Sequence, residues 1–396
     1  MTRRLAITVL ACALFAVGCG SSDDGAAETT TTSPVTTTTA PKGAETPYVE
    51  DGPYAAGTIN LALADGRRVV VWYPTDKAAV AGQPKENFDI ASLLSPELQA
   101  KIPAEKRPPY EIAAHPGAAP ATEKAPYPLV LFSHGYAGFP EQSADLVTHL
   151  ASWGFIVIAP DHVERSLSGL LGTAAKGVTP RQDPEVLSAS LVAAIADGTD
   201  DASPLHGLMD LDKVAVAGHS AGASAAYLTA SSDDRIKAFI SYSVGTGKPD
   251  ANGKAAERPV PDVPGMVMLG TADGIIPPAN SKKVYEGMNP PKYLVEIADA
   301  GHLVFSDICL IGKDKGGLVQ LTKEAGLDLG DDLLRLASDC CEPDKLDPAK
   351  AFGAIDHFSV AFLRYELGID PEPVGLNEAT AASFTTADVS LTSDTE

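Results

Sequence analysis

The sequence predicts an α/β fold with a mostly parallel central sheet and helices on both faces. Two observations predict it: short apolar runs recur along the middle of the chain, and helix-like stretches separate them. Short apolar runs are typical of strands buried on both faces, and their alternation with helices produces a parallel sheet. A third observation is a serine motif that lies between one of these runs and a helix.

The predicted elements begin with an N-terminal β-hairpin, in which residues 58–63 and 67–73 flank the turn Ala64-Asp65-Gly66. A Pro- and Ala-rich excursion, 74–126, follows, and we expect it to form loops with one short helix. The predicted buried strands are Leu129–Phe132, Phe155–Ala159, Val214–Ala217, Ala238–Ile240, Met266–Leu269 and Tyr293–Ile297. The predicted helices are 140–152, 184–197, 221–231, 278–288 and 349–367.

The N-terminus has the features of a bacterial export signal. Two arginines precede the apolar run Leu5–Val17, which is too short to span a bilayer comfortably. The run ends Ala16-Val17-Gly18-Cys19, which resembles a lipobox, although Ala16 stands where that motif usually has Leu. We therefore expect residues 1–18 to be a lipoprotein signal peptide. Acyl chains on Cys19 would hold the protein on the outer face of a bacterial membrane, and plain secretion is the alternative.

Two further segments differ in composition from the predicted core. Residues 20–46 contain nine Thr and a single large aliphatic residue, Val35, which predicts a Thr-rich linker over 19–46. The segment 369–396 carries six carboxylates and no Lys or Arg, and we expect an acidic disordered tail there. One folded domain is therefore expected over 47–368.

The charge balance restricts the class of partner. The 396 residues include 30 basic and 52 acidic side chains, which gives a formal net charge of −22. Nucleic-acid binding needs clustered Lys and Arg, and a strongly acidic surface disfavours acidic substrates. We therefore expect a neutral or apolar substrate, no nucleic-acid partner, and a monomer.

Three cysteines remain once Cys12 is removed with the signal and Cys19 is lipidated. Outside the cytoplasm, a disulfide from Cys309 to either Cys340 or Cys341 is expected, and one thiol is then left over. No His lies at ligand spacing from these cysteines, and we expect no metal site.

The most specific motif is Gly218-His219-Ser220-Ala221-Gly222. It follows the apolar run ending at Ala217 and opens an Ala-rich helix. Strand, G-x-S-x-G and helix in this order predict a nucleophile elbow, in which a tight turn presents the serine hydroxyl above the sheet. Ser220 is therefore the predicted nucleophile.

A serine nucleophile needs a base and a carboxylate that orients the base, in the order Ser, acid, His. Asp273 lies in a Gly-flanked turn after the run 266–269, and His302 follows the next run. We predict these two as the acid and the base. The competing residues are expected to be structural or surface groups; they are Asp299, Asp307, His162, His219 and His357.

The oxyanion of an acyl-transfer intermediate needs preformed N–H donors. One predicted donor is the backbone N–H of Ala221, at the start of the helix after the elbow. The second is the N–H of Tyr136, because His134-Gly135 turns the backbone after the first buried strand toward the site. The Tyr136 ring is also expected to line the substrate pocket.

These residues resemble the α/β-hydrolase superfamily over roughly Pro126 to Gly368. The motifs Leu131-Phe132-Ser133-His134-Gly135, Leu150–Phe155 and Asp161–Ser166 resemble the platelet-activating-factor acetylhydrolase and chlorophyllase-like branch. The elbow and the Asp273/His302 pair also resemble bacterial cutinases and polyester hydrolases. The resemblance implies an α/β-hydrolase fold, a serine acyl-enzyme mechanism and no cofactor. The segment 303–348 is longer than in cutinases, and we expect an insertion that forms a lid or a wall of the cleft.

The sequence therefore predicts an exported serine ester hydrolase that acts on neutral or apolar esters, with polyesters and phospholipid-like acetyl esters among the candidates. A non-catalytic surface binding protein on the same scaffold is the alternative from another class. A peptidase with the same triad is a minor alternative, because the sequence contains no propeller or large cap that would gate peptides.

Overall fold

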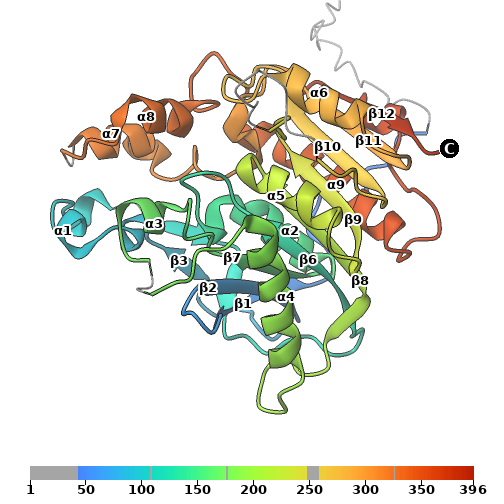
Figure 1. Cartoon of the computed structure of the whole chain (residues 1–396), viewed down its shortest axis with the longest axis horizontal. Helices are drawn as coiled ribbons and strands as arrows, with labels where there is room; N and C mark the ends of the chain where they lie inside the picture. Colours follow the sequence, from blue (N-terminus) through green and yellow to red (C-terminus); the bar gives the residue numbers. More distant parts are fainter. Residues whose placement is uncertain (1–42, 108, 175–176, 248–257, 325) are drawn as a thin grey trace, which may run out of the picture. The chain divides into compact units, whose positions relative to one another are not determined.

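A computed structural model describes residues 43–107, 109–174, 177–247, 258–324 and 326–396 (Figure 1). The signal peptide, Cys19 and most of the Thr-rich linker lie outside these residues, and the predictions about them stay predictions. Within the described ranges, no helix is both long enough and apolar enough to cross a membrane.

The main sheet of the described domain has ten strands. They are β1 (Ala55–Ala62), β2 (Arg68–Thr75), β5 (Ala114–Pro116), β6 (Tyr127–Ser133), β7 (Ile156–Pro160), β8 (Met209–His219), β9 (Ile236–Tyr242), β10 (Gly265–Gly270), β11 (Lys292–Ile297) and β12 (Val389–Asp394). Their order across the sheet is β12-β11-β10-β9-β8-β6-β7-β2-β1-β5. Neighbours from β11 to β7 all run parallel, whereas β1, β2 and β12 each have an antiparallel neighbour. The predicted mostly parallel sheet and its N-terminal hairpin are confirmed.

Helices cover both faces of this sheet, as predicted. The α-helices are α1 (Pro96–Gln99), α2 (Ala144–Ser152), α3 (Leu167–Leu171), α4 (Asp183–Gly198), α5 (Ala221–Ala230), α6 (Pro278–Glu286), α7 (Gly317–Glu324), α8 (Gly330–Ser338), α9 (Phe352–Glu366) and α10 (Glu378–Ala381). Val130 and Phe132 of β6 belong to one buried cluster with α2 and α9, and Leu129 and Leu131 belong to a second with α4, α5 and α6. Alternate residues of a strand thus fill opposite layers, which explains why the strands are apolar throughout.

The middle of the segment 74–126 and the insertion after β11 both lie next to the carboxyl ends of the parallel strands (Figure 1). The first, 74–126, contains more structure than the predicted loops with one short helix. Besides α1 and β5, it forms the two-stranded sheet of β3 (Glu86–Phe88) and β4 (Tyr110–Ile112) and the 3-10 turns η1 (Ile90–Leu93) and η2 (Ala104–Lys106). The sequence does not predict β3 and β4, because three residues are too few to show an alternating pattern.

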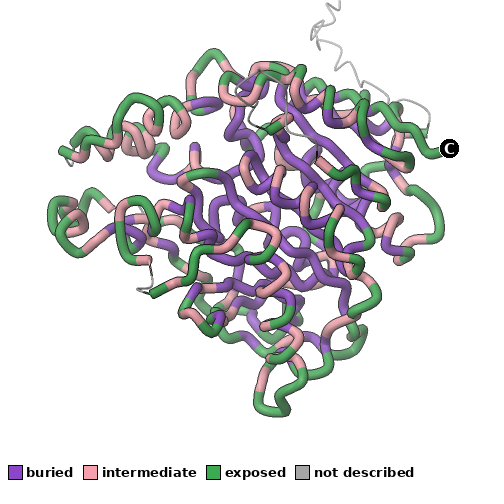
Figure 2. The backbone as a smooth tube through the Cα atoms, in the orientation of Figure 1, coloured by how far each residue is buried: buried purple, intermediate pink, exposed green. Residues whose placement is uncertain are grey.

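The second segment is the insertion that follows β11. It contains η4 (His302–Phe305), η5 (Lys313–Lys315), α7, α8 and η6 (Pro348–Lys350). Neither α7 nor α8 has a fully buried residue, and Figure 2 shows both helices as exposed or half-buried, in contrast with the buried strands of the sheet. The insertion contacts the first segment through an ion pair between Lys106 and Glu324, with 2.5 Å between Nζ and Oε2.

The prediction of an acidic disordered tail over 369–396 is wrong. β12 pairs antiparallel with β11 and forms the edge of the sheet. Val389 and Leu391 are buried and alternate with exposed residues, which is the pattern of a half-buried strand. Asp370, one of the six carboxylates, forms an ion pair with Arg364 of α9. The high acid content of this segment suggested disorder, although Val389 and Leu391 follow the alternating pattern of a strand. That strand is stabilised by pairing with β11.

Candidate active site

Ser220 lies at the junction of β8 and α5 in the conformation of a nucleophile elbow. Its backbone has φ 60° and ψ −116°, a region that residues other than glycine rarely adopt and that costs about 1–3 kcal/mol. The surrounding structure holds this conformation: the Ser220 N–H donates to the carbonyl of Tyr242, at 2.9 Å. The side chain is nearly buried but lines a cleft at the carboxyl end of the sheet.

The two glycines of the motif are required by close backbone approaches. A Cβ on Gly222 would lie 1.9 Å from the carbonyl oxygen of Ser133, and one on Gly218 would lie 2.3 Å from the carbonyl oxygen of Gly222. Any side chain at either position would force β6, β8 and α5 apart. The spacing of the motif is therefore a packing requirement of the turn that presents Ser220.

Asp273 and His302 form a hydrogen-bonded pair beside this turn. Asp273 follows β10 and His302 begins η4 after β11; His302 Nδ1 and Asp273 Oδ2 are 2.8 Å apart. The other carboxylate oxygen of Asp273 accepts the N–H groups of Ile275 and Ile276, at 2.9 and 2.7 Å. Burial works to raise the pKa of Asp273, but the hydrogen bond and charge of His302 and these two N–H groups together hold it below its usual value.

The opposite ring nitrogen of His302, Nε2, takes no part in the contact with Asp273. His302 Nε2 is buried and, within the described part of the chain, has no hydrogen-bond partner. His302 and Ser220 line the same cleft. The structure thus pairs Asp273 with His302 and places Ser220 in the lining of the same cleft, at the carboxyl ends of β10, β11 and β8. No hydrogen bond joins Ser220 Oγ to His302 Nε2 in this structure.

The competing histidines occupy structural positions. His219 is buried, its Nδ1 contacts Gln142 Nε2 at 2.9 Å, and its Nε2 lies 2.9 Å from the carbonyl oxygen of His302. Burial, with a smaller effect of the neighbouring His302, lowers the pKa of His219 to about 3, which keeps the ring neutral. His219 therefore supports the backbone of His302 through the contact with its carbonyl oxygen. His162 contacts Ser133 inside the core, and His357 contacts the carbonyl of Gly375.

Asp299 and Asp307, the alternatives to Asp273 as the acid, lie away from the His302 ring. The Asp299 N–H donates to Thr271 Oγ1, and Asp299 has φ 57°, which marks it as a turn residue. Asp307 is buried under α2, where its Oδ2 accepts the N–H of Asp145 at 2.9 Å. Neither is in the lining of the cleft.

The loop after β6 presents the second predicted N–H donor. The Gly135 N–H donates to Gln142 Oε1 at 3.0 Å, and the Ala137 N–H donates to the carbonyl of Arg165 at 2.7 Å. The N–H groups of Tyr136 and Ala221 have no acceptor among the described residues. The Tyr136 ring is 49% exposed and lines the cleft. The two predicted donors are therefore free and adjoin the cleft, as an oxyanion hole requires.

Arg165, for which the sequence predicted no role, holds this loop from the core side. Its guanidinium donates to the carbonyls of His134 and Gly135 and, at 2.9 Å, to Ser133 Oγ. Asp183 of α4 pairs with it at 3.1 Å. Arg165 lies in the run Asp161–Ser166, which carried part of the family resemblance, but nothing local in that run indicates which backbone it contacts.

The cleft itself is mainly apolar and is shared by distant segments. Ser220 and His302 lie at its base, and Tyr136 lies at its rim. Its apolar wall comes from the first segment, from α3 and from the insertion; these residues include Ile90, Leu94, Ile102, Leu167, Leu171, Leu318, Leu321, Leu327, Leu333, Leu334 and Leu336. The expectation that the insertion forms a wall of the substrate cleft agrees with this lining.

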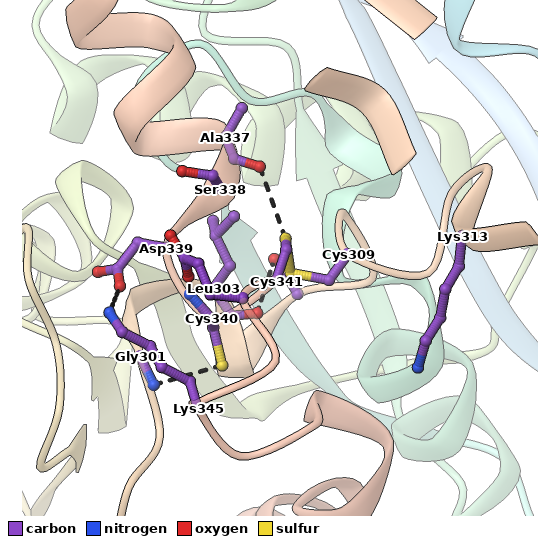
Figure 3. The surroundings of a disulfide bond; sticks show 12 residues. Gly301, Leu303, Cys309, Lys313, Ala337, Ser338, Asp339, Cys340, Cys341 and Lys345 are labelled. Carbon is purple, nitrogen blue, oxygen red and sulfur yellow. Dashed lines mark hydrogen bonds and ion pairs between the residues drawn. A yellow bond between two sulfur atoms is a disulfide. The ribbon is translucent and has the colours of Figure 1, made fainter. Parts of the chain in front are cut away.

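The structure resolves the cysteine alternatives that the sequence left open. Cys309 pairs with Cys341, and Cys340 is a free, buried thiol (Figure 3). Burial raises the pKa of the Cys340 thiol to about 12, which makes it unreactive at neutral pH. Among the described residues, no group of three or more His, Cys, Asp or Glu side chains is arranged to hold a metal ion.

Comparison with known proteins gives one matching family model, which includes the elbow, and two similar sequences. A family profile described as Chlorophyllase matches residues 104–263, which contain the β6 loop and Ser220 but end before Asp273. Chlorophyllase-2 of Arabidopsis thaliana is 25% identical over 272 residues, covering 56% of this chain and 80% of that protein. Platelet-activating factor acetylhydrolase of Cavia porcellus is 26% identical over 283 residues, covering 62% of this chain and 58% of that protein.

A solved structure shares the fold over most of the chain. The ferulic acid esterase from Streptomyces cinnamoneus superposes with a TM-score of 0.53 and 21% sequence identity, covering 86% of this chain and 96% of that one. At this identity the likeness shows the fold alone. It agrees with the predicted α/β-hydrolase architecture, including the parallel sheet and the helices on both of its faces.

Proposed function

We propose that the chain is a carboxylic ester hydrolase of the α/β-hydrolase superfamily that acts through a Ser220 acyl-enzyme, with Asp273 and His302 as its acid and base. The similarity to a chlorophyllase and to a platelet-activating factor acetylhydrolase supports this class of activity. The observation that carries this proposal is the His302–Asp273 contact of 2.8 Å: Nε2 of the same ring has no partner among the described residues, and His302 and Ser220 line the same cleft. An imidazole whose Nδ1 is held by a carboxylate and whose Nε2 is unpaired is suited to act as general base for a serine hydroxyl in the same cleft.

In the first step His302 Nε2 takes the Ser220 proton while Oγ attacks the ester carbonyl. The Asp273 carboxylate stabilises the imidazolium that forms, because it accepts the Nδ1–H. The oxygen of the tetrahedral intermediate is negatively charged, and the free N–H groups of Tyr136 and Ala221 are its proposed donors. Collapse of the intermediate breaks the ester C–O bond, and His302 returns the proton to the leaving alcohol.

In the second step water releases the acid. His302 takes a proton from the water as its oxygen attacks the acyl carbonyl, and the second intermediate uses the same donors. Ser220 Oγ leaves and recovers the proton from His302. All groups in this cycle belong to the chain itself, and each is used in both halves of the reaction.

The proposed substrate is a neutral ester with an apolar part. The cleft wall consists mainly of Leu and Ile side chains, and the formal net charge of −22 disfavours anionic molecules. Carboxylesters with long alkyl chains and extracellular polyesters both fit this description. The similarity to a platelet-activating factor acetylhydrolase supports a phospholipid acetyl ester as the alternative substrate.

We further propose that the enzyme works outside the cytoplasm, anchored through Cys19. The basic and apolar N-terminus and the lipobox-like residues support this location. The Cys309–Cys341 disulfide adds a second argument, because structural disulfides persist mainly in oxidising compartments. Globomycin treatment of the producing bacterium, which blocks lipoprotein signal cleavage, should leave the precursor uncleaved if Cys19 is lipidated.

The catalytic proposal is tested by Ser220→Ala assayed on p-nitrophenyl butyrate. Turnover should fall by at least about 10³-fold with an unchanged circular dichroism spectrum, because the residual site retains only binding and the oxyanion donors. Ser232→Ala is the matched control: this serine is exposed near the end of the same helix and should behave as the parent protein. Activity retained in Ser220→Ala would contradict the assignment of the nucleophile.

A further inference from the structure

The end of the insertion reaches back to the two loops that carry the proposed acid and base. Asp339 directly follows α8 and is only 4% exposed. Its Oδ2 accepts the N–H of Gly274 at 2.8 Å and the N–H of His302 at 3.2 Å. Gly274 is the residue after Asp273. One carboxylate oxygen therefore joins the acid loop to the backbone of the base.

The neighbouring contacts fix the position of this carboxylate. Oδ1 of Asp339 pairs with the ammonium of Lys345, and the backbone carbonyl of Asp339 accepts the Leu303 N–H at 3.0 Å. Figure 3 shows Asp339 next to Gly301 and Lys345. A Cβ on Gly301 would lie 2.9 Å from Asp339 Oδ1 and 2.7 Å from the backbone nitrogen of Cys340, so that the fit between the two chain segments is close.

The disulfide anchors the peptide that carries Asp339. Cys341, two residues later, is bonded to Cys309, which follows η4. Between them Cys340 Sγ accepts the Gly301 N–H at 3.3 Å. The insertion thus leaves the core just after His302, forms part of the cleft wall with α7 and α8, and returns to the loop from which it started.

We propose that Asp339 is a positioning residue for the Asp273–His302 pair. This inference depends on the proposed function, since it assigns a role to a contact with the proposed acid and base. Asp339 does not line the cleft. It acts through the Gly274 and His302 N–H groups, whose separation sets how the Asp273 carboxylate meets the His302 ring.

The physical reason lies in how the two loops are otherwise connected. Asp273 and His302 follow different strands, and their side chains meet through a single hydrogen bond. Removing the Asp339 carboxylate leaves the buried His302 N–H without an acceptor and releases the Gly274 N–H of the exposed acid loop, which drives the backbone to rearrange. Displacement of a catalytic group by about 1 Å costs about 100-fold in rate.

The kinetic consequence is specific. Loss of positioning lowers the rate of the chemical step, whereas the cleft that binds the ester is left in place. Asp339→Ala should therefore lower kcat on p-nitrophenyl butyrate by about 10- to 100-fold, with KM changed by less than about threefold. The matched control is Asp344→Asn, an exposed carboxylate five residues away in the same segment, which should leave both constants unchanged.

A second variant separates the role of the acceptor oxygen from the role of the ion pair. In Asp339→Asn combined with Lys345→Met, the amide oxygen of the new side chain remains to accept both N–H groups, and the half-buried Lys345 cation is removed together with its partner. This double variant should keep kcat within about threefold of the parent enzyme. It also decides the question if Asp339→Ala does not fold, because it preserves the shape of the side chain.

Two results would overturn the inference: an unchanged kcat in folded Asp339→Ala, or a loss in the double variant of about 10-fold or more. The second result would show that kcat depends on the negative charge of Asp339 and not on the oxygen that accepts the two N–H groups. Failure of the proposed function is distinguishable from both, because it would appear as retained turnover in Ser220→Ala, whatever the Asp339 variants do.

Discussion

The elbow and the insertion are built in opposite ways. Ser220 lies between a strand and a helix of the core, and Gly218 and Gly222 hold its backbone by direct contact with neighbouring main chain. The insertion after His302 has two helices without a fully buried residue, and a disulfide and one buried carboxylate attach its ends to the core. Ser220, the proposed nucleophile, is thus fixed by dense packing, and the cleft wall is held by a few specific bonds.

Because of this difference, we expect changes in the elbow to affect the chemical step, and changes in the insertion to affect which esters bind. Changes in the elbow must disturb the sheet, because no neighbouring atom can move without displacing backbone. Changes on the cleft side of α7 and α8 alter what the cleft admits but leave the core unchanged. Asp339 is the exception, since it belongs to the insertion in sequence and contacts the backbone of the proposed base.

The largest expected effect is in the elbow, with Gly222→Ala. The added Cβ would lie 1.9 Å from the Ser133 carbonyl oxygen, and we expect a loss of at least about 3 kcal/mol in the free energy of unfolding, together with loss of activity. Urea unfolding followed by circular dichroism measures it. Gly287→Ala is the matched control, because its φ is −84° and a Cβ there would be 3.6 Å from the nearest atom, an ordinary contact. Equal stability of the two variants would refute the packing argument.

The second prediction concerns the cleft side of α8. Leu333 and Leu334 line the cleft and are half-buried. Replacing both by Ala should raise KM for p-nitrophenyl dodecanoate by about 10-fold and leave p-nitrophenyl butyrate within about twofold, because only the long chain reaches this wall. The control is Leu211→Ala, at an exposed position on β8. An equal effect on both esters would mean that α8 does not contact the alkyl chain.

The smallest effect is expected where the insertion joins the core, at Asp307. Burial, and then the charge of Asp145, raise the pKa of Asp307 from 3.8 to about 8. Asp356 and Tyr110 also face this carboxyl, and burial raises the pKa of each. The folded state therefore keeps a proton that the unfolded chain loses above pH 4, and stability falls as the pH rises from about 4 to about 8.

Asp307→Asn removes this dependence because its amide stays neutral and keeps an acceptor for the Asp145 N–H. The gain in Tm over the parent protein should be at least about 2 °C larger at pH 9 than at pH 5. Thermal unfolding at the two pH values measures the difference. A gain that is the same at both would show that Asp307 is already ionised in the folded protein at pH 5.

The parts of the molecule that sequence predicts well are those with local causes. The elbow is visible because G-x-S-x-G stands between a buried strand and a helix, and the order of the later apolar runs predicted where Asp273 and His302 would meet. The choice between Cys340 and Cys341 was not predictable, because adjacent side chains point in different directions that a turn at Cys340, with φ 90°, decides.

Long-range contacts account for what the sequence did not reveal. Nothing near Asp339 or Arg165 in the sequence indicates the backbone groups that their side chains contact. Those groups lie 37 and 65 residues away from Asp339, and 30 and 31 residues away from Arg165. The edge strand β12 was missed because an isolated alternation of two apolar residues gains its meaning only when β11 lies beside it.

The most direct test of the central claim is the site of covalent labelling by a fluorophosphonate. If His302 activates Ser220, a single adduct should appear by peptide mass spectrometry on the peptide that contains Ser220, and His302→Ala should slow labelling by at least about 100-fold. An adduct on another serine, or labelling of His302→Ala at the parent rate, would contradict the account.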